Sequence, residues 1–203
     1  MLEQAIIIIG ITFMVMISPG PDMLIVIRNT LIGGKTAGLQ TSAGIVAGNL
    51  VHISYCLVGI GLLISQSIVL FTILKLLSAA YLIYLGISSL RSKPQPLDAT
   101  SSLPASSRTW FIQGFLNNIL NPKGALFYLG VFTVVITPDT TLLATVLLVL
   151  LMKSISIGFW VLFVSALDQP VVRNGFGRFQ SWINKLFGGL LILLGIKVAT
   201  ASQ

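Results

Sequence analysis

Ser18-Pro19-Gly20-Pro21-Asp22 interrupts the first long apolar stretch of the sequence and decides how that stretch folds. Proline lacks a backbone donor and clashes with the preceding turn, so two prolines around a glycine break a helix. In a bilayer such a break is tolerated only where protein or water satisfies the freed backbone groups. Pro21 and Asp22 suit the start of a new helix. A simple kink capped by Asp22 is one interpretation, but an acid in the break favours a functional site.

The composition around this break indicates a membrane protein. The 203 residues are 55% hydrophobic and 8% charged, whereas a soluble domain carries roughly 25% charged residues. A membrane-spanning helix needs about 20 apolar residues. We therefore expect an all-α integral membrane protein with six transmembrane helices. The predicted spans lie near 4–27, 38–63, 68–90, 110–136, 141–166 and 181–200.

The positive charge lies mostly in short loops between the apolar stretches. The net charge of +7 could suggest a nucleic-acid partner, but no basic face is present and that partner is excluded. Basic loops at 28–37, 91–109 and 167–180 alternate with nearly uncharged links. The positive-inside rule predicts cytoplasmic basic loops and both termini outside. The N-terminus lacks a basic signal-peptide region, so we expect the first helix to remain in the mature protein.

The sequence also divides into two similar halves. Residues 91–109 are rich in Pro, Ser and Ala and predict a flexible cytoplasmic linker between residues 1–90 and 110–203. Leu82–Ile87 in the third span matches Leu191–Ile196 in the sixth. Three helices per half place the halves in opposite orientations, which predicts a 3+3 inverted repeat.

A second break repeats the first one in the other half. Asn121-Pro122-Lys123-Gly124 interrupts the fourth span, and Pro122 and Lys123 align with Pro21 and Asp22. Gln113, Asn117 and Asn121 precede the proline at intervals that place three amides on one helix face. Amides can simply join helices in a membrane, but that interpretation does not explain Lys123.

Two further ionisable residues lie near the middle of spans. His52 follows Asn49 by nearly one turn in the second span, and Lys153 precedes Ser156 in the fifth. A charge at this depth costs at least ~2.5–3.5 kcal/mol, so such residues are usually functional. A lone histidine is often a structural residue of a core, and that alternative stays open for His52.

These groups predict a site at the bilayer midplane with one acid and two or three bases. The candidate residues for substrate binding and transport are Pro19, Gly20, Pro21, Asp22, Asn49, His52, Asn117, Asn121, Pro122, Lys123 and Lys153. An amino-acid zwitterion fits this charge balance, because its carboxylate would neutralise the excess of bases and Asp22 would accept its ammonium. We expect no catalytic residue, cofactor or metal ion.

The motifs together resemble the LysE/RhtB family of amino-acid exporters. The resemblance rests on the residues 18–22, on Gly38, Gly44, Gly48 and His52, on the segment from Lys75 to Gly86, on Phe115-Leu116 and on Asn121-Pro122-Lys123. It implies a bacterial inner-membrane protein that exports amino acids at the expense of the proton-motive force. Many members look to carry an acid where this chain has Asn49, which shifts the expected proton carrier to Asp22 or His52.

We therefore expect a secondary transporter, not an enzyme, that exports a neutral amino acid such as threonine or homoserine by proton antiport. A permease for another small zwitterion or ion, and a membrane scaffold without transport, remain alternatives. Cys56 is the single cysteine and excludes a dithiol electron carrier. A GxSxG-like motif for a hydrolase is missing. Gly44 and Gly48 indicate close packing within the chain, with a homodimer face as the alternative.

Overall fold

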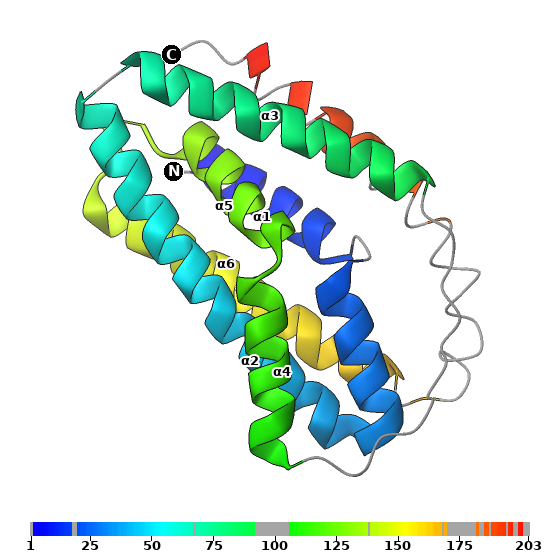
Figure 1. The fold of residues 1–203 in the computed structure, drawn as a ribbon. Coiled ribbons are helices and arrows are strands. Elements are labelled where there is room, and N and C mark those ends of the chain that lie inside the picture. The colour runs from blue at the N-terminus through cyan, green and yellow to red at the C-terminus, as the bar shows by residue number, and fades with distance from the viewer. Residues whose placement is uncertain are drawn as a thin grey trace.

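The computed structural model describes residues 2–17, 20–66, 68–91, 106–137, 139–167, 169, 182, 185–186, 188–193, 195–196 and 199–200. All regular secondary structure in these ranges is α-helical (Figure 1). The helices are α1 (Leu2–Ile17), α2 (Pro21–Gln66), α3 (Ile68–Arg91), α4 (Ser107–Ile119), α5 (Pro122–Val135) and α6 (Leu142–Leu167). Helical residues after Trp182 lie alongside α3. Most of the predicted linker falls outside the described residues.

The break predicted in the first span is present. α1 ends at Ile17 and α2 begins at Pro21, with the Leu24 amide donating to the Gly20 carbonyl at 3.0 Å. Ser18 and Pro19 lie outside the described residues. The new helix thus starts at the proline, whose fixed φ suits a first helical position.

The loop expected at residues 28–37 is mostly helical, contrary to prediction. α2 continues past Arg28 and departs from helical geometry inside only at Gly34, where φ is 72° and ψ is −172°. Glycine reaches this positive φ without a Cβ clash, so one residue can reverse the direction of the chain. Figure 1 shows the two arms of α2 meeting at this turn. The first arm completes the broken first span, and the second arm corresponds to the second span.

The break in the fourth span is also present, between α4 and α5. The Asn121 side chain caps α5 by accepting a hydrogen bond from the Lys123 amide at 3.0 Å, and Pro122 occupies the start of the helix. An asparagine cap satisfies one of the unpaired amides of a helix N-terminus. The sequence here encodes a new helix start as well as the end of the old helix.

Glycines let the second arm of α2 pack directly on the backbone of α4. A Cβ atom at Gly44 would lie 2.1 Å from the Phe111 carbonyl oxygen, and one at Gly114 would lie 2.0 Å from the Thr41 carbonyl oxygen. Gly48 faces the Asn118 side chain in the same seam. Gly44 and Gly48 therefore pack against α4 of the same chain, as the packing interpretation of these glycines predicts.

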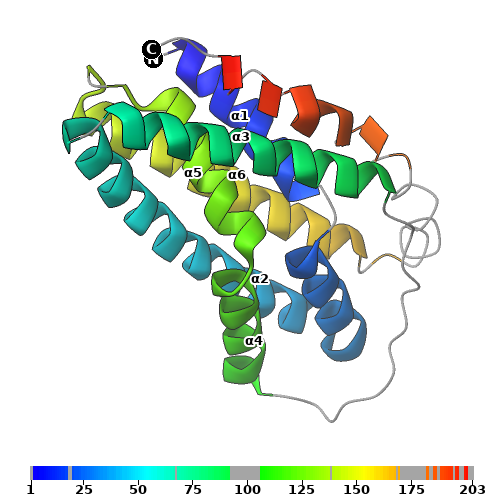
Figure 2. The ribbon, with the colours of Figure 1, turned by 45° about the horizontal axis from the view of Figure 1, so that its top comes forward.

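A second close contact joins α3 to the helical residues 188–193 and 195–196. A Cβ atom at Gly86 would lie 2.6 Å from both the Gly188 carbonyl oxygen and the Ile192 side chain. A Cβ atom at Gly195 would lie 2.6 Å from the Ile83 side chain and 2.8 Å from the Ala79 carbonyl oxygen. The later residues of one segment contact the earlier residues of the other, so the two segments pack antiparallel (Figure 2).

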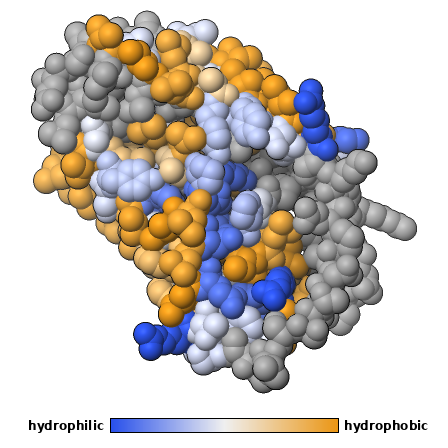
Figure 3. All heavy atoms as spheres, viewed as in Figure 1, coloured by the Kyte–Doolittle hydropathy of each residue, from blue (hydrophilic) through white to orange (hydrophobic). Residues whose placement is uncertain are grey.

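The surface of the molecule is largely apolar. Figure 3 shows apolar side chains over much of one face, with a polar band over α4 and its junction with α5. By length and composition, two helices among the described residues could cross a bilayer, Pro21–Gly59 and Leu142–Leu167. The first of these includes the Gly34 turn. The other predicted spans are not recovered by this measure.

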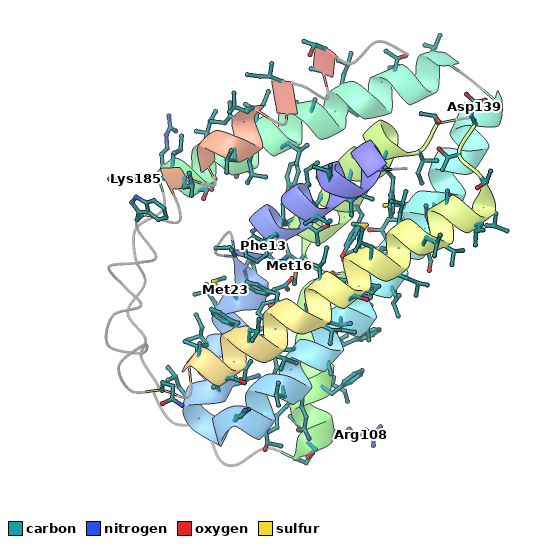
Figure 4. The ribbon with its side chains drawn as sticks, turned by 180° about the vertical axis from the view of Figure 1, so that it is seen from behind. Phe13, Met16, Met23, Arg108, Asp139 and Lys185 are labelled. Carbon is teal, nitrogen blue, oxygen red and sulfur yellow. The ribbon has the colours of Figure 1, made fainter. Side chains whose placement is uncertain are left out.

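Charged residues lie at the two ends of the long helices. Figure 4 places Arg108 and Lys185 toward one end and Asp139 at the other. Lys35 follows the Gly34 turn and is exposed. Arg108 and Lys185 thus lie toward a common end, away from Asp139.

Candidate functional site

The two helix breaks meet at a cavity of about 60 Å³ in the interior of the molecule. Its lining comes from all helices except α3 and α4 and combines polar and apolar side chains. The lining residues are Thr12, Val15, Met16, Gly20, Asp22, Met23, Ile45, Asn49, Asn121, Lys123, Gly124, Phe127, Tyr128 and Trp160. Figure 4 shows Met16 and Met23 on either side of the first break, near α6.

Asp22 provides the negative charge of the cavity. Its two carboxylate oxygens accept hydrogen bonds from the Asn117 amide at 2.7 Å and the Asn118 amide at 2.8 Å. Both donors come from the end of α4, so the second half of the chain holds the acid of the first break. Hydrogen bonds to an ionised carboxylate are roughly twice as strong as neutral ones. They fix the direction in which the carboxylate faces the cavity.

Lys123 provides the positive charge of the cavity and lies beside the first break. A Cβ atom at Gly20 would lie 3.2 Å from the Lys123 Nζ atom, so the missing side chain leaves room for the ammonium. Asp22 and Lys123, which align in the sequence halves, line the same cavity. Two opposite charges here can each bind one end of a zwitterion.

Asn118 connects the groups around the cavity and was not among the predicted residues. Its amide nitrogen donates to Asp22 and also to the Asn49 side chain at 3.0 Å. Its backbone carbonyl accepts from His52 Nε2 at 2.9 Å. The amide stripe predicts a role for the adjacent Asn117, whereas Asn118 lies about 100° away from the stripe on the helix.

The three amides of the predicted stripe have separate roles. Gln113 accepts a hydrogen bond from Asn29 at 3.0 Å, away from the cavity lining. Asn117 bonds Asp22, whereas Asn121 caps α5 and lines the cavity. The stripe therefore does not form one continuous polar face toward a substrate.

His52 lies behind the wall of the cavity. Its Nε2 atom faces a carbonyl oxygen, which only accepts, so Nε2 carries a proton. Its Nδ1 atom is 2.5 Å from the Tyr55 hydroxyl, and its ring stacks on Tyr128 at a centroid distance of 6.3 Å. Tyr128 in turn lines the cavity. His52 thus contacts cavity residues without being part of the described lining.

Lys153 also lies outside the cavity lining. It is 8% exposed, and its ammonium donates to the Val46 backbone carbonyl of α2. The predicted cluster of Asp22, His52, Lys123 and Lys153 is thus divided: the cavity holds the acid and one lysine. The other two bases, His52 and Lys153, each contact a backbone carbonyl oxygen of a neighbouring helix.

The prolines of the predicted site have a backbone role where they are described. Pro21 and Pro122 start α2 and α5 and are exposed, whereas Pro19 lies outside the described residues. Thr12 and Trp160 also line the cavity and were not among the predicted residues. A threonine within an apolar stretch and a tryptophan in a span carry no local signal that separates them from core residues.

Metal-binding geometry is missing from the described part of the chain. These residues contain no group of three or more His, Cys, Asp or Glu side chains placed to hold an ion. Asp22 is held by amide donors, which compete with rather than assist cation binding.

Comparisons with known proteins cover nearly the whole chain. The family model described as LysE type translocator matches residues 13–202. The chain is 32% identical to the uncharacterized membrane protein YrhP of Bacillus subtilis, over 93% of this chain and 95% of that protein. It is 27% identical to a threonine efflux protein of Salmonella typhi, over 89% and 90% of the two chains.

A third relative extends the range of named substrates. The chain is 29% identical to a homoserine/homoserine lactone efflux protein of Salmonella typhi, over 91% of this chain and 90% of that protein. No solved structure matches this chain.

Proposed function

The chain belongs to the LysE type translocator family, and on that premise we propose that it exports a small neutral amino acid, with threonine and homoserine as first candidates. It is a membrane protein of a transporter family and not an enzyme. The observation that carries the substrate proposal is the shared cavity of Asp22 and Lys123 at the two helix breaks.

The charges of the cavity suit both ends of an amino acid. Asp22 accepts the substrate ammonium, and Lys123 binds its carboxylate. Each end of the zwitterion then lies beside a group of opposite charge, which offsets the cost of removing the substrate's charges from water. The lone acid gives little attraction for a second positive charge, so a neutral side chain is favoured over a basic one.

The size of the cavity favours a small substrate. Its volume of about 60 Å³ is far below the roughly 300–1,000 Å³ of pockets that hold drug-sized ligands. The site must widen to admit even a small amino acid, which fits a transporter that opens to one side at a time. The broken helices provide the segments that can move.

We also propose six spans arranged as two inverted halves, residues 1–90 and 110–203, joined by the cytoplasmic linker 91–109. The reciprocal contacts support this arrangement: Gly86 meets Gly188 and Ile192, while Gly195 meets Ala79 and Ile83. Under the alignment of Leu82–Ile87 with Leu191–Ile196, each contact maps onto the other, as an interface with two-fold symmetry requires.

The proposed location is the bacterial inner membrane with both termini outside. The arrangement of Arg108 and Lys185 toward one end, opposite Asp139, supports a cytoplasmic basic end. Protons are the proposed coupling ions, because the cavity lining contains one carboxylate, Asp22, that can bind either a proton or a substrate ammonium. Competition between the two ligands for one group gives antiport.

The test is amino-acid efflux from cells that overexpress the protein and are loaded with dipeptides. External threonine and homoserine are followed over time, with and without an uncoupler. Asp22→Asn keeps the side-chain size but removes the charge, and we expect at least about tenfold slower export, equivalent to 1.4 kcal/mol. Asp139→Asn is the matched control, since this acid lies far from the cavity.

The outcomes separate the parts of the proposal. Export of none of a broad amino-acid panel by the wild type would contradict the function and favour a scaffold or another substrate. Export that continues unchanged with the uncoupler would contradict proton coupling alone. Full activity of Asp22→Asn would remove Asp22 from the mechanism.

A further inference from the structure

Two residues that line the cavity each carry a neutral polar atom with no hydrogen-bond partner among the described residues. These atoms are Thr12 Oγ1 and Trp160 Nε1, and their side chains are 3% and 4% exposed. Both residues line the cavity of Asp22 and Lys123. A buried polar group without a partner costs about 1–3 kcal/mol, so such groups usually bond a ligand or water.

The two groups come from elements that do not contribute the charges. Thr12 lies on α1 and Trp160 on α6, whereas Asp22 and Lys123 start α2 and α5. A zwitterion that places its charged groups on Asp22 and Lys123 leaves its side chain for the remaining polar groups. The hydrogen-bonding capacity of Thr12 and Trp160 then selects that side chain.

The chemistry of the pair specifies a hydroxyl group. The indole Nε1–H only donates, so it needs an acceptor, while the threonine hydroxyl both donates and accepts. A substrate hydroxyl can accept a hydrogen bond from Trp160 Nε1–H and donate one to Thr12 Oγ1. Nearby Met23 and Ile45, which pack in one apolar cluster with Trp160, suit the carbon atoms of the substrate side chain.

The orientation of the indole is fixed by its neighbours. Trp160 makes edge-on contacts with Phe159 and Phe163, with ring centroids 5.2 Å and 5.8 Å apart. A donor held in place before binding loses little freedom when the ligand arrives. A rigid donor discriminates among side chains better than a mobile one.

We propose that Thr12 and Trp160 form a hydroxyl-recognition subsite that makes this transporter prefer hydroxylated amino acids over aliphatic ones of equal size. This proposal rests on the proposed function and names the residues that set its specificity. Threonine against valine, and homoserine against norvaline, are matched pairs in which a methyl replaces the hydroxyl.

The first experiment compares efflux of these pairs from cells loaded with the corresponding dipeptides. A site built to bond a hydroxyl rejects the analogue without it. We therefore expect the wild type to export threonine at least about tenfold faster than valine. Trp160→Phe and Thr12→Val should reduce threonine export but leave valine export unchanged or faster. Trp182→Phe and Thr145→Val, which lie outside the cavity lining, are the controls.

The second experiment measures binding without transport. The chain has three tryptophans, so replacing Trp110 and Trp182 with Phe leaves Trp160 as the reporter in purified protein. Threonine and homoserine should change its emission in a saturable way, and valine should need a higher concentration. This measurement keeps Trp160 in place, so it still tests the proposal if Trp160→Phe fails to fold.

The outcomes distinguish the subsite from the function. Equal loss of threonine and valine export in Trp160→Phe and Thr12→Val would overturn the subsite, as would wild-type export without preference within the pairs. The subsite proposal would also be overturned if the protein exports threonine but threonine leaves the fluorescence of Trp160 unchanged. Failure of the wild type to export any amino acid contradicts the proposed function itself.

Discussion

At the scale of single residues, Asn118 holds the site together. Its side chain donates to both Asp22 and Asn49, and its carbonyl accepts from His52. It is 1% exposed, so each lost bond leaves a buried group without water to replace the partner. Asn118 therefore joins the acid of the first break to the second arm of α2.

Replacing Asn118 should cost more stability than replacing its neighbour. Asn118→Ala removes one buried and one partly buried hydrogen bond, whereas Asn117→Ala removes one partly buried bond. We expect Asn118→Ala to lower the free energy of unfolding by about 1–3 kcal/mol more than Asn117→Ala. Thermal unfolding of the purified variants in detergent measures the difference. Equal losses would show that Asn118 is not the central connection.

The sequence predicted the charges of the cavity and two of its asparagines, Asn49 and Asn121, but not Thr12 or Trp160. Asp22 and Lys123 were identifiable because charges in apolar spans are costly and both follow proline breaks. Thr12 and Trp160 were not, because both residue types are common in apolar cores. For Lys153, the position in the middle of a predicted span indicated a functional residue. The sequence could not show that its ammonium donates to the Val46 carbonyl instead of lining the cavity.

At the scale of helices, the glycine seam between α2 and α4 sets the position of the site. Gly44 and Gly114 each meet the backbone of the other helix, and Asn118 follows Gly114 by about one turn. The close approach brings the Asn118 side chain within reach of Asn49. A wider separation would break the bonds that orient Asp22.

Gly44→Ala should therefore destabilise the fold and slow transport together. The added Cβ would lie 2.1 Å from a carbonyl oxygen of α4, and overpacking of this kind costs about 1–3 kcal/mol or more. Gly59→Ala is the control, because nothing lies within 4 Å of its Cβ position. Alanine favours a helix by up to about 1 kcal/mol over glycine, so the control should be neutral or more stable. Thermal unfolding and threonine efflux are the measurements. Equal stability and equal efflux of Gly44→Ala and Gly59→Ala would contradict the close packing of α2 on α4.

The helix breaks could be predicted from sequence, but the reversal at Gly34 could not. Proline removes a donor wherever it stands, so the positions of Pro21 and Pro122 predicted two new helix starts. Basic residues near Gly34 predicted a loop of several residues, but the helix continues to a single glycine at positive φ. Gly33 and Gly34 are adjacent, and sequence alone does not tell which one adopts that conformation.

At the scale of the whole molecule, α3 and the helical residues after Trp182 meet in a reciprocal contact. The Cβ positions of Gly86 and Gly195 have matching surroundings, each with an isoleucine side chain at 2.6 Å and a backbone carbonyl at 2.6–2.8 Å. The sequence predicted the equivalence of the segments from a short apolar match. It did not predict that the two segments touch, because a sequence repeat shows which residues are equivalent and not which residues are in contact.

Matching surroundings predict matching effects of substitution. Gly86→Ala and Gly195→Ala should destabilise the protein by similar amounts, each about 1–3 kcal/mol. Gly189→Ala is the control, because it lies in the same segment with nothing within 4 Å of its Cβ position. The double variant should lose less than the sum, since the first alanine already separates the segments that the second would crowd. Thermal unfolding of the four variants in detergent measures this, and a large loss in only one glycine variant would contradict two-fold packing of the halves. Because the contact joins the third helical segment of each proposed half, equal losses would also support the proposal of two inverted halves.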